Sequence, residues 1–329
     1  MSAIVKGALG ALALTIALLT PALAQTTLKI GWTTSDGPQD PYAIAARQFA
    51  DALEELAPGQ FTVQFFPNRQ LGDEKEMLEG LSFGTLDMAV ITNAVIANIA
   101  PAFQLNDLPF LFASEAQAHR VLDGPIGAEL LAQLEDKGIV GLGFAEGGFR
   151  HMINNVRPVE RPEDVAGVKY RVMQNPVYIE MFQALGGNAV PMAWGEVFTA
   201  VQQGTVDGLE IPVPVIANNK YAEVTRYLSL TKHTYSALGF LMSGRRYDRL
   251  DEAQQQLVQR AAQTAIARQR AVNAANVEAL IAQLEAGGMA VNAVGTPAQF
   301  RSQVRPLYER FRDTIGSELL DRTLAAVEE

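Results

Sequence analysis

Residues 167–212 read GVKYRVMQNPVYIEMFQALGGNAVPMAWGEVFTAVQQGTVDGLEIP and alternate between two kinds of pattern. Short segments with apolar side chains at every second residue predict β-strands, and longer segments with helical spacing predict α-helices. The order favours parallel strands joined by helices. The predicted elements are a strand at Val168–Val172, a helix at Val177–Leu185, a strand at Ala189–Met192, a helix at Glu196–Gln203 and a strand at Thr205–Leu209.

The first of these strands places a basic side chain opposite an apolar face. In Val168–Val172, residues 168, 170 and 172 share one face, so Lys169 and Arg171 point the other way. Arg171 lies near the C-terminal end of the strand, where open α/β sheets bind ligands. Its planar guanidinium fits a carboxylate through two parallel hydrogen bonds. A receptor for a small anion is one interpretation, and an exposed arginine on an edge strand is the other.

The N-terminal half repeats the strand–helix order. Pro109 makes Leu108–Phe112 a predicted buried loop rather than a central strand. The other predicted elements are strands at Thr27–Trp32, Gln60–Phe66, Leu86–Thr92 and Val140–Ala145, and helices that begin after Asp40, Asp73 and Ser114 and span Ile126–Lys137. Each half therefore predicts one α/β lobe.

The C-terminal third predicts the elements that join the two halves. Apolar strands within Thr234–Ser243 are expected to cross back to the first half. Asp251–Glu285 has no Gly or Pro, which predicts one or two helices long enough to contact both halves. Thr296 is expected to begin a last helix, in a capping box with Gln299.

Composition excludes several classes of protein. The chain has 329 residues, a formal net charge of −10, no cysteine and three scattered histidines. Without a basic stripe, nucleic acid is not an expected partner. Without Cys or a His motif, neither a disulfide nor a metal site is expected.

The N-terminus matches a secretory signal peptide, predicted at residues 1–24. Lys6 supplies the positive region, Gly7–Thr20 the apolar run and Ala22–Ala24 a small-residue cleavage site. A membrane anchor is the alternative, but the apolar run is shorter than the ~20 residues that a span needs. No lipid-anchor cysteine is present, so no direct membrane anchor is expected.

Common catalytic motifs are absent. The chain has no Walker A lysine motif and no GxSxG elbow, and Gly141–Gly147 has the spacing GxGxxxG rather than that of a dinucleotide loop. Glu74 and Glu76 stand two apart on a predicted helix, and we interpret both as part of solvated helix faces. Trp194 is interpreted as either a cleft wall or a core residue.

Several segments, taken in order, resemble a known receptor family. They are Pro67–Asp73, Gly84–Met88, Leu108–Phe112, Gly148–His151, Arg161–Lys169, Arg171–Val172 and Glu196–Gly208. With the signal peptide, their order and spacing resemble the periplasmic solute receptors of tripartite ATP-independent periplasmic (TRAP) transporters, of the dicarboxylate-receptor type. The resemblance covers nearly all of the mature chain.

The resemblance implies an α/β fold with two closing lobes, crossing hinge strands and a long bracing helix. Lobe I is expected to comprise residues 25–148 and 237–276, and lobe II residues 149–236 and 277–329. The implied ligand-binding residues are Arg171 on the ligand carboxylate, Arg150 as a second anion contact, Trp194 beside the ligand, Asp73, Thr92 and Asn93 on the wall of lobe I, and the position of Ile211. Glu210 and His233 are expected behind Arg171, fixing its rotamer.

One position departs from the family pattern. Members often have Glu-Asn-Pro where this chain has Glu210, Ile211 and Pro212, so a polar ligand contact is lost. Our hypothesis is a ligand that is less hydroxylated or more apolar on that side. C4-dicarboxylates, sugar acids, 2-oxo acids and aromatic acids all remain open.

The expected function is capture of an organic acid in the periplasm of a Gram-negative bacterium and its delivery to a TRAP permease, without a cofactor. Two rivals remain. One is an exported enzyme that uses Glu210 and His233 as acid and base, and the other is a receptor for an ABC importer or a sensor kinase.

Overall fold

The computed structural model describes residues 25–328, so the predicted signal peptide at residues 1–24 lies outside the described residues. The strands are β1 Thr26–Gly31, β2 Phe61–Phe66, β3 Met88–Thr92, β4 Ile139–Asn154, β5 Lys169–Val172, β6 Asn188–Pro191, β7 Gly208–Pro212, β8 Tyr227–Ser243 and β9 Ala290–Ala293. The α-helices are α1 Pro41–Leu56, α2 Glu74–Phe83, α3 Asn93–Ile96, α4 Glu115–Leu122, α5 Pro125–Ala132, α6 Pro176–Ala184, α7 Trp194–Gln202, α8 Val213–Asn218, α9 Gly244–Tyr247, α10 Glu252–Ala286, α11 Pro297–Val304, α12 Leu307–Ile315 and α13 Ser317–Glu328. Short 3₁₀ segments are η1 Pro101–Asp107, η2 Glu135–Lys137, η3 Pro162–Val165 and η4 Tyr221–Glu223.

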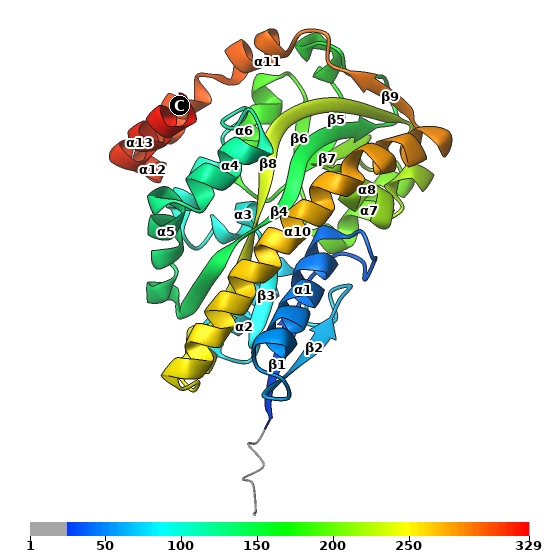
Figure 1. The fold of residues 1–329 in the computed structure, drawn as a ribbon. Helices are drawn as coiled ribbons and strands as arrows, with labels where there is room; N and C mark the ends of the chain where they lie inside the picture. Colours follow the sequence, from blue (N-terminus) through cyan, green and yellow to red (C-terminus); the bar gives the residue numbers. More distant parts are fainter. Residues whose placement is uncertain (1–24, 329) are drawn as a thin grey trace, which may run out of the picture.

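The strands form one sheet that passes through both halves of the molecule. Its order is β2-β1-β3-β8-β4-β7-β5-β6, with β9 paired to β8 (Figure 1). β1 is parallel to β2 and β3, and β5 is parallel to β6 and β7. The antiparallel pair β4 and β8 joins these two parallel groups. The α/β class and the crossing strands predicted from the sequence are confirmed.

The crossing strands are longer than the sequence predicts. β4 has 16 residues and β8 has 17, against predicted strands at Val140–Ala145 and Thr234–Ser243. Register shifts interrupt their pairing at Gly141/Gly143, Glu146/Gly148 and Arg150/Met152. Such bulges bend a strand and increase its twist, so a single pair of strands can follow the change of direction between the two halves.

A single helix, α10, contacts both halves, which settles the choice between one helix and two. It has 35 residues and begins at a capping box between Asp251 and Gln254. At 1.5 Å per residue it is about 52 Å long. It packs against α1 of the first half and α8 of the second half (Figure 1). The buried side chain of Gln269 donates to Pro41 O and Glu146 O, which ties α10 to α1 and β4.

Three local predictions were wrong. β7 begins at Gly208 rather than Thr205, because residues 205–207 form a bend in which Asp207 accepts a hydrogen bond from Lys169 N. The predicted helix Ile126–Lys137 ends at Ala132 and continues as a turn and η2. Thr296 makes no side-chain cap bond. The buried loop at Leu108–Phe112 is confirmed.

The exact lobe boundaries stay a prediction. Residues 317–328, expected in lobe II, form α13 and pack against α4 and α5, which lie within the predicted range of lobe I. Arg322 pairs with Glu129 across this contact. The C-terminal helices therefore contact elements of both predicted lobes.

Candidate functional site

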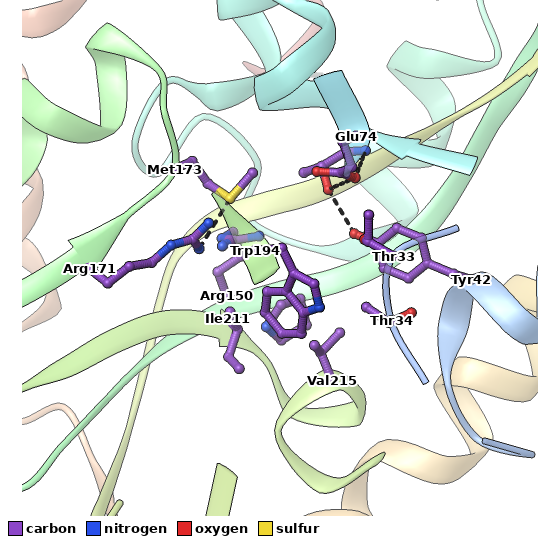
Figure 2. Close-up of a pocket in the computed structure, with 12 residues that line it drawn as sticks. Thr33, Thr34, Tyr42, Glu74, Arg150, Arg171, Met173, Trp194, Ile211 and Val215 are labelled. Atoms are coloured by element: carbon purple, nitrogen blue, oxygen red, sulfur yellow. Dashed lines mark hydrogen bonds between the residues drawn. The ribbon is translucent and has the colours of Figure 1, made fainter. Parts of the chain in front are cut away.

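A small cavity, partly open to solvent, lies between the two halves. Figure 2 shows its side chains converging from both sides. The first half contributes Thr33, Thr34, Tyr42, Glu74 and Thr92, and the second contributes Arg150, Arg171, Met173, Trp194, Ile211, Pro212 and Val215. The polar residues of the first half thus face two arginines and a group of apolar side chains.

Arg171 is a buried cation without an ionic partner. β5 places it in the cavity wall, where its side chain is only 2% exposed. Nε and Nη2 donate to Met192 O at 2.9 and 2.6 Å, and Nη1 lies 3.5 Å from Met173 Sδ. Among residues 25–328, no carboxylate lies within ion-pair distance of its guanidinium. Burial lowers the pKa of Arg171 below its ordinary value, because a desolvated charge is disfavoured.

Arg150, the second arginine, is already neutralised. Its Nη2 donates to Glu210 Oε1 at 2.7 Å and to Glu210 O at 2.6 Å, and its Nε contacts Glu210 Oε2. Burial alone would raise the pKa of Glu210, but the charge of Arg150 and bonds from Arg150 and His233 outweigh burial and lower it. His233 Nε2 lies 3.2 Å from Glu210 Oε2, and its Nδ1 lies 2.7 Å from the Thr231 hydroxyl. Because a carboxylate only accepts, Nε2 carries the proton.

Glu210 and His233 were expected to hold the side chain of Arg171. That expectation was wrong, because Glu210 bonds the guanidinium of Arg150 instead. Arg171 is aligned with Leu209 across β5 and β7, one residue before Glu210. Neighbouring residues of a strand have their side chains on opposite faces, so Glu210 forms no hydrogen bond with Arg171 and acts on it through its charge alone. The β4–β7 register instead places Glu210 opposite Met152, two residues from Arg150 and on the same face. The carboxylate consequently bonds Arg150.

Glu74 is the charged residue of the site that sequence reasoning missed; the uncharged lining residues Thr33, Thr34, Tyr42, Met173, Pro212 and Val215 were missed as well. Glu74 is 5% exposed and lines the cavity, whereas Glu76 is exposed as expected. Thr92 donates to its Oε1 twice, from the backbone N and from Oγ1, both at 2.7 Å. Burial raises the pKa of Glu74 to about 7. A usable signal was present, because Glu74 belongs to the same helical face as the apolar residues 77, 78 and 81.

Of the other predicted residues, three line the cavity. Thr92 belongs to the wall of the first half, and its hydroxyl lies 2.7 Å from Tyr42 Oη. Trp194, the first residue of α7, lines the opposite wall and packs on Tyr221 with ring centroids 5.5 Å apart. Ile211 lines the cavity next to β7's end and is 2% exposed.

Two predicted residues do not line the cavity. Asn93 is buried, but its Nδ2 donates to Phe103 O and its Oδ1 accepts from Asn106 Nδ2, so its polar atoms stabilise the η1 segment. Asp73 caps α2, and its Oδ2 accepts from Gly195 N at 2.9 Å. Both side chains bond protein groups in this structure, and their predicted role at the ligand stays a prediction.

The bond between Asp73 and Gly195 is one of several that join the two halves around the cavity. Asn219 accepts from Ser35 N at 2.9 Å and donates to Asp40 at 3.1 Å. Asn98 donates to Gln174 O at 3.1 Å. The halves therefore meet in a closed arrangement.

Within residues 25–328, no three His, Asp or Glu side chains gather in the way that metal ligands do. No helix among the same residues combines the length and apolarity needed to cross a membrane.

Comparisons with known proteins agree with this architecture. The model of bacterial extracellular solute-binding proteins, family 7, matches residues 33–314. A solute-binding protein of Verminephrobacter eiseniae is 40% identical over 305 residues, or 93% of this chain and 90% of that protein. The similar solved structures include two TRAP periplasmic solute-binding proteins.

The first structure, from a Polaromonas species and bound to D-erythronate, has a TM-score of 0.87 and 39% identity and covers 92% of this chain and 99% of its own. The second, from a Bordetella species and with density assigned to pantoate, has a TM-score of 0.87 and 38% identity and covers 91% of this chain and 99% of its own. The chain therefore belongs to family 7 of the bacterial extracellular solute-binding proteins, the solute receptors of the TRAP type.

Proposed function

We propose that this protein captures an organic acid in the cavity, with the ligand carboxylate on Arg171. The observation that carries the proposal is the buried guanidinium of Arg171, which faces the cavity and bonds only a carbonyl and a thioether among the described residues. A buried cation is stable when an anion pairs with it. Hydrogen bonds to charged groups contribute about 1.5–3 kcal/mol each, so a bidentate carboxylate can dominate the affinity.

The site supports binding rather than catalysis. Glu210 and His233, the acid and base of the enzyme alternative, do not line the cavity. Both are fully buried, and the Glu210 carboxylate is committed to Arg150. Neither is therefore placed to exchange a proton with a ligand.

Binding assays with the purified protein test this function. Ligand retained from the cell is identified by mass spectrometry, and its affinity is measured by calorimetry. Arg171→Ala should weaken binding by about 100-fold or more, and Arg171→Lys should also weaken it because the planar fork is lost. Arg249→Ala, which removes an exposed arginine outside the cavity, is the matched control. Normal affinity in the Arg171 variants, or conversion of the ligand to a product, contradicts the proposal.

We further infer that the protein acts in the periplasm and delivers its ligand to a TRAP permease. The support is family membership and the signal peptide pattern at residues 1–24. Two measurements test this inference. The N-terminal sequence of the protein from the periplasm should begin at Gln25, and uptake of the acid should require both this protein and the permease. Uptake through an ABC importer instead contradicts the proposed partner.

A further inference from the structure

Among the described contacts that join the two halves, the carboxylate of Asp73 has a role that the others lack. Its Oδ1 accepts from Glu74 N at 3.0 Å, which caps α2 of the first half. Its Oδ2 accepts from Gly195 N at 2.9 Å, in the first turn of α7 of the second half. One side chain therefore caps two helices, one from each half.

The helix α7 has no side-chain cap from its own N-terminal segment. Its N-cap position is Ala193, whose methyl side chain accepts no hydrogen bond. The first N–H groups of a helix have no partner within the helix, and an N-cap side chain accepts from the second or third of them. Gly195 is the second residue of α7, so Asp73 takes the place of the missing cap. Its negative charge also suits a helix N-terminus.

The two halves approach each other closely at Gly195. A Cβ added there would lie 1.8 Å from Arg69 Nη1 and 2.6 Å from its Cζ, so the Arg69 guanidinium lies against the backbone of the glycine. Arg69 and Asp73 belong to the same turn before α2, and a bond from Arg69 N to Trp32 O ties that turn to the segment after β1. Because the turn is held by the first half, the bond to Gly195 forms only when the second half is close.

The two capped helices carry residues of opposite cavity walls. Glu74 is the first residue of α2, Trp194 is the first residue of α7, and both line the cavity. When the halves separate, Asp73 keeps its bond to α2 but loses its bond to α7. The first turn of α7, which includes Trp194, is then left without its cap.

We propose that Asp73 is a positioning residue that acts through Gly195. It completes the N-terminus of α7 when the halves close, and it thereby fixes Trp194 beside the bound acid and slows release of the acid. The inference rests on the proposed function, since an acid must bind between the halves. It assigns Asp73 a bond to the protein backbone instead of a contact with the ligand. Because the cap forms after the acid has entered, its loss should change the dissociation rate rather than the association rate.

The variant Asp73→Ser removes the cap of α7 alone. Serine is as good an N-cap as aspartate, so α2 keeps its cap, but its single oxygen on a shorter side chain cannot also bond Gly195. Stopped-flow fluorescence follows binding, with Trp194 as the reporter in the cavity wall. The probe is D-erythronate, the acid bound in the structure of the Polaromonas relative, or the acid that mass spectrometry identifies in the purified protein.

The dissociation rate of the probe from Asp73→Ser should rise at least about tenfold, because a hydrogen bond to a charged group is lost from the closed state. The association rate should not fall. Removing a negative charge by itself favours an anion, so faster release has to come from the lost bond.

A second measurement separates the cap from a direct ligand contact. With ¹⁵N-glycine labelling, NMR gives the exchange rate of the Gly195 N–H, whose signal is identified by its absence in Gly195→Ala. At saturating probe, this N–H should exchange at least about tenfold more slowly in the wild type than in Asp73→Ser. The control is Ser114→Ala, which removes the cap of α4 away from the cavity. It should change neither the release rate nor the exchange of Gly195.

The outcomes distinguish this inference from the proposed function. If Asp73→Ser releases the probe at the wild-type rate, the role of Asp73 is wrong and the receptor function stands. Faster release with unchanged exchange of Gly195 would mean that Asp73 contacts the ligand itself, which also overturns the inference. If the protein neither binds D-erythronate nor retains any acid, the proposed function fails as well.

Discussion

The cavity and the region beneath it handle buried charge in opposite ways. Arg150 lines the cavity, but behind the cavity wall it forms a closed set with Glu210 and His233, in which the carboxylate bonds both the cation and the imidazole. In the cavity walls, Arg171 and Glu74 have neutral partners only, among the described residues. This difference indicates that the role of a buried arginine depends on whether the protein itself supplies an anionic partner for it. Arg150 has its counter-charge within the protein, and its predicted contact with the ligand stays a prediction, whereas we propose that Arg171 binds the anion of the ligand.

The largest expected effect on stability comes from removing the carboxylate that Arg150 and His233 share. Glu210→Ala leaves the Arg150 charge buried without a partner, so the free energy of unfolding should fall by about 3–5 kcal/mol. Urea unfolding measures the loss. Glu309→Ala is the matched control, because it breaks an exposed ion pair with Arg312, which should cost less than about 1 kcal/mol. An equal loss of unfolding free energy in the two variants would mean that the buried Glu210 carboxylate contributes no more to stability than an exposed ion pair does.

The next effect concerns Glu74 and depends on pH. Its pKa is about 7 in the folded protein, against an ordinary value of 4.5. The folded state thus keeps the proton to higher pH than the unfolded state, so the wild type loses stability as pH rises from 4.5 to about 7. Glu74→Gln removes this loss and should be more stable at pH 8 by on the order of 3 kcal/mol.

Urea unfolding at pH 5 and pH 8, without organic acid in the buffer, measures this difference. The advantage of Glu74→Gln should be small at pH 5 and grow toward pH 8. Glu76→Gln should show no such growth, because its side chain is exposed. If the stability advantage of Glu74→Gln over wild type is the same at pH 8 as at pH 5, Glu74 does not carry an unpaired buried charge.

A smaller effect sharpens the contrast between the two arginines. Arg171→Met removes the buried cation that has no ionic partner, so the empty protein should gain about 1 kcal/mol of stability while acid binding is lost. Thermal unfolding with and without the ligand measures both changes. Arg150→Met, which strands Glu210, should instead lower stability. A stability loss in Arg171→Met as large as that in Arg150→Met would mean that Arg171 is structural.

The smallest expected effect is on ligand affinity and concerns Ile211. Ile211 follows Glu210 on β7 and lies in the apolar part of the cavity wall. Ile211→Asn places an amide against the apolar side of the ligand, so affinity should fall about five- to tenfold, or about 1 kcal/mol. Calorimetry with the retained ligand measures it. Unchanged or tighter binding would remove the hypothesis that the ligand is apolar on this side.

Local patterns in the sequence predicted some features of this site and not others. Alternation in residues 168–172 placed Arg171 on the face opposite Tyr170 and Val172. In the structure Tyr170 and Val172 belong to the hydrophobic core, and Arg171 lines the cavity. The partner of Glu210 depends on the register between β4, β5 and β7, which are separated by many residues, so no local pattern contains it. Glu74 was missed because it was interpreted together with Glu76 as part of a solvent-exposed helix surface. The apolar residues 77, 78 and 81 on the same helical face as Glu74 indicated burial instead. The glycines in residues 141–148 have a weak strand propensity, so the sequence predicted too short a strand for β4. Pairing with β8 overrides that propensity in the folded protein.

The long helix α10 has a mechanical consequence. One hydrophobic cluster includes Phe49 of α1, Val213 of α8, and Val258 and Leu284 near opposite ends of α10. Because both halves share this core through α10, neither half can melt alone without exposing a stripe of the helix to water. Heating should give one cooperative transition, and a half expressed by itself should aggregate. The two halves are therefore parts of one cooperative unit rather than interchangeable modules.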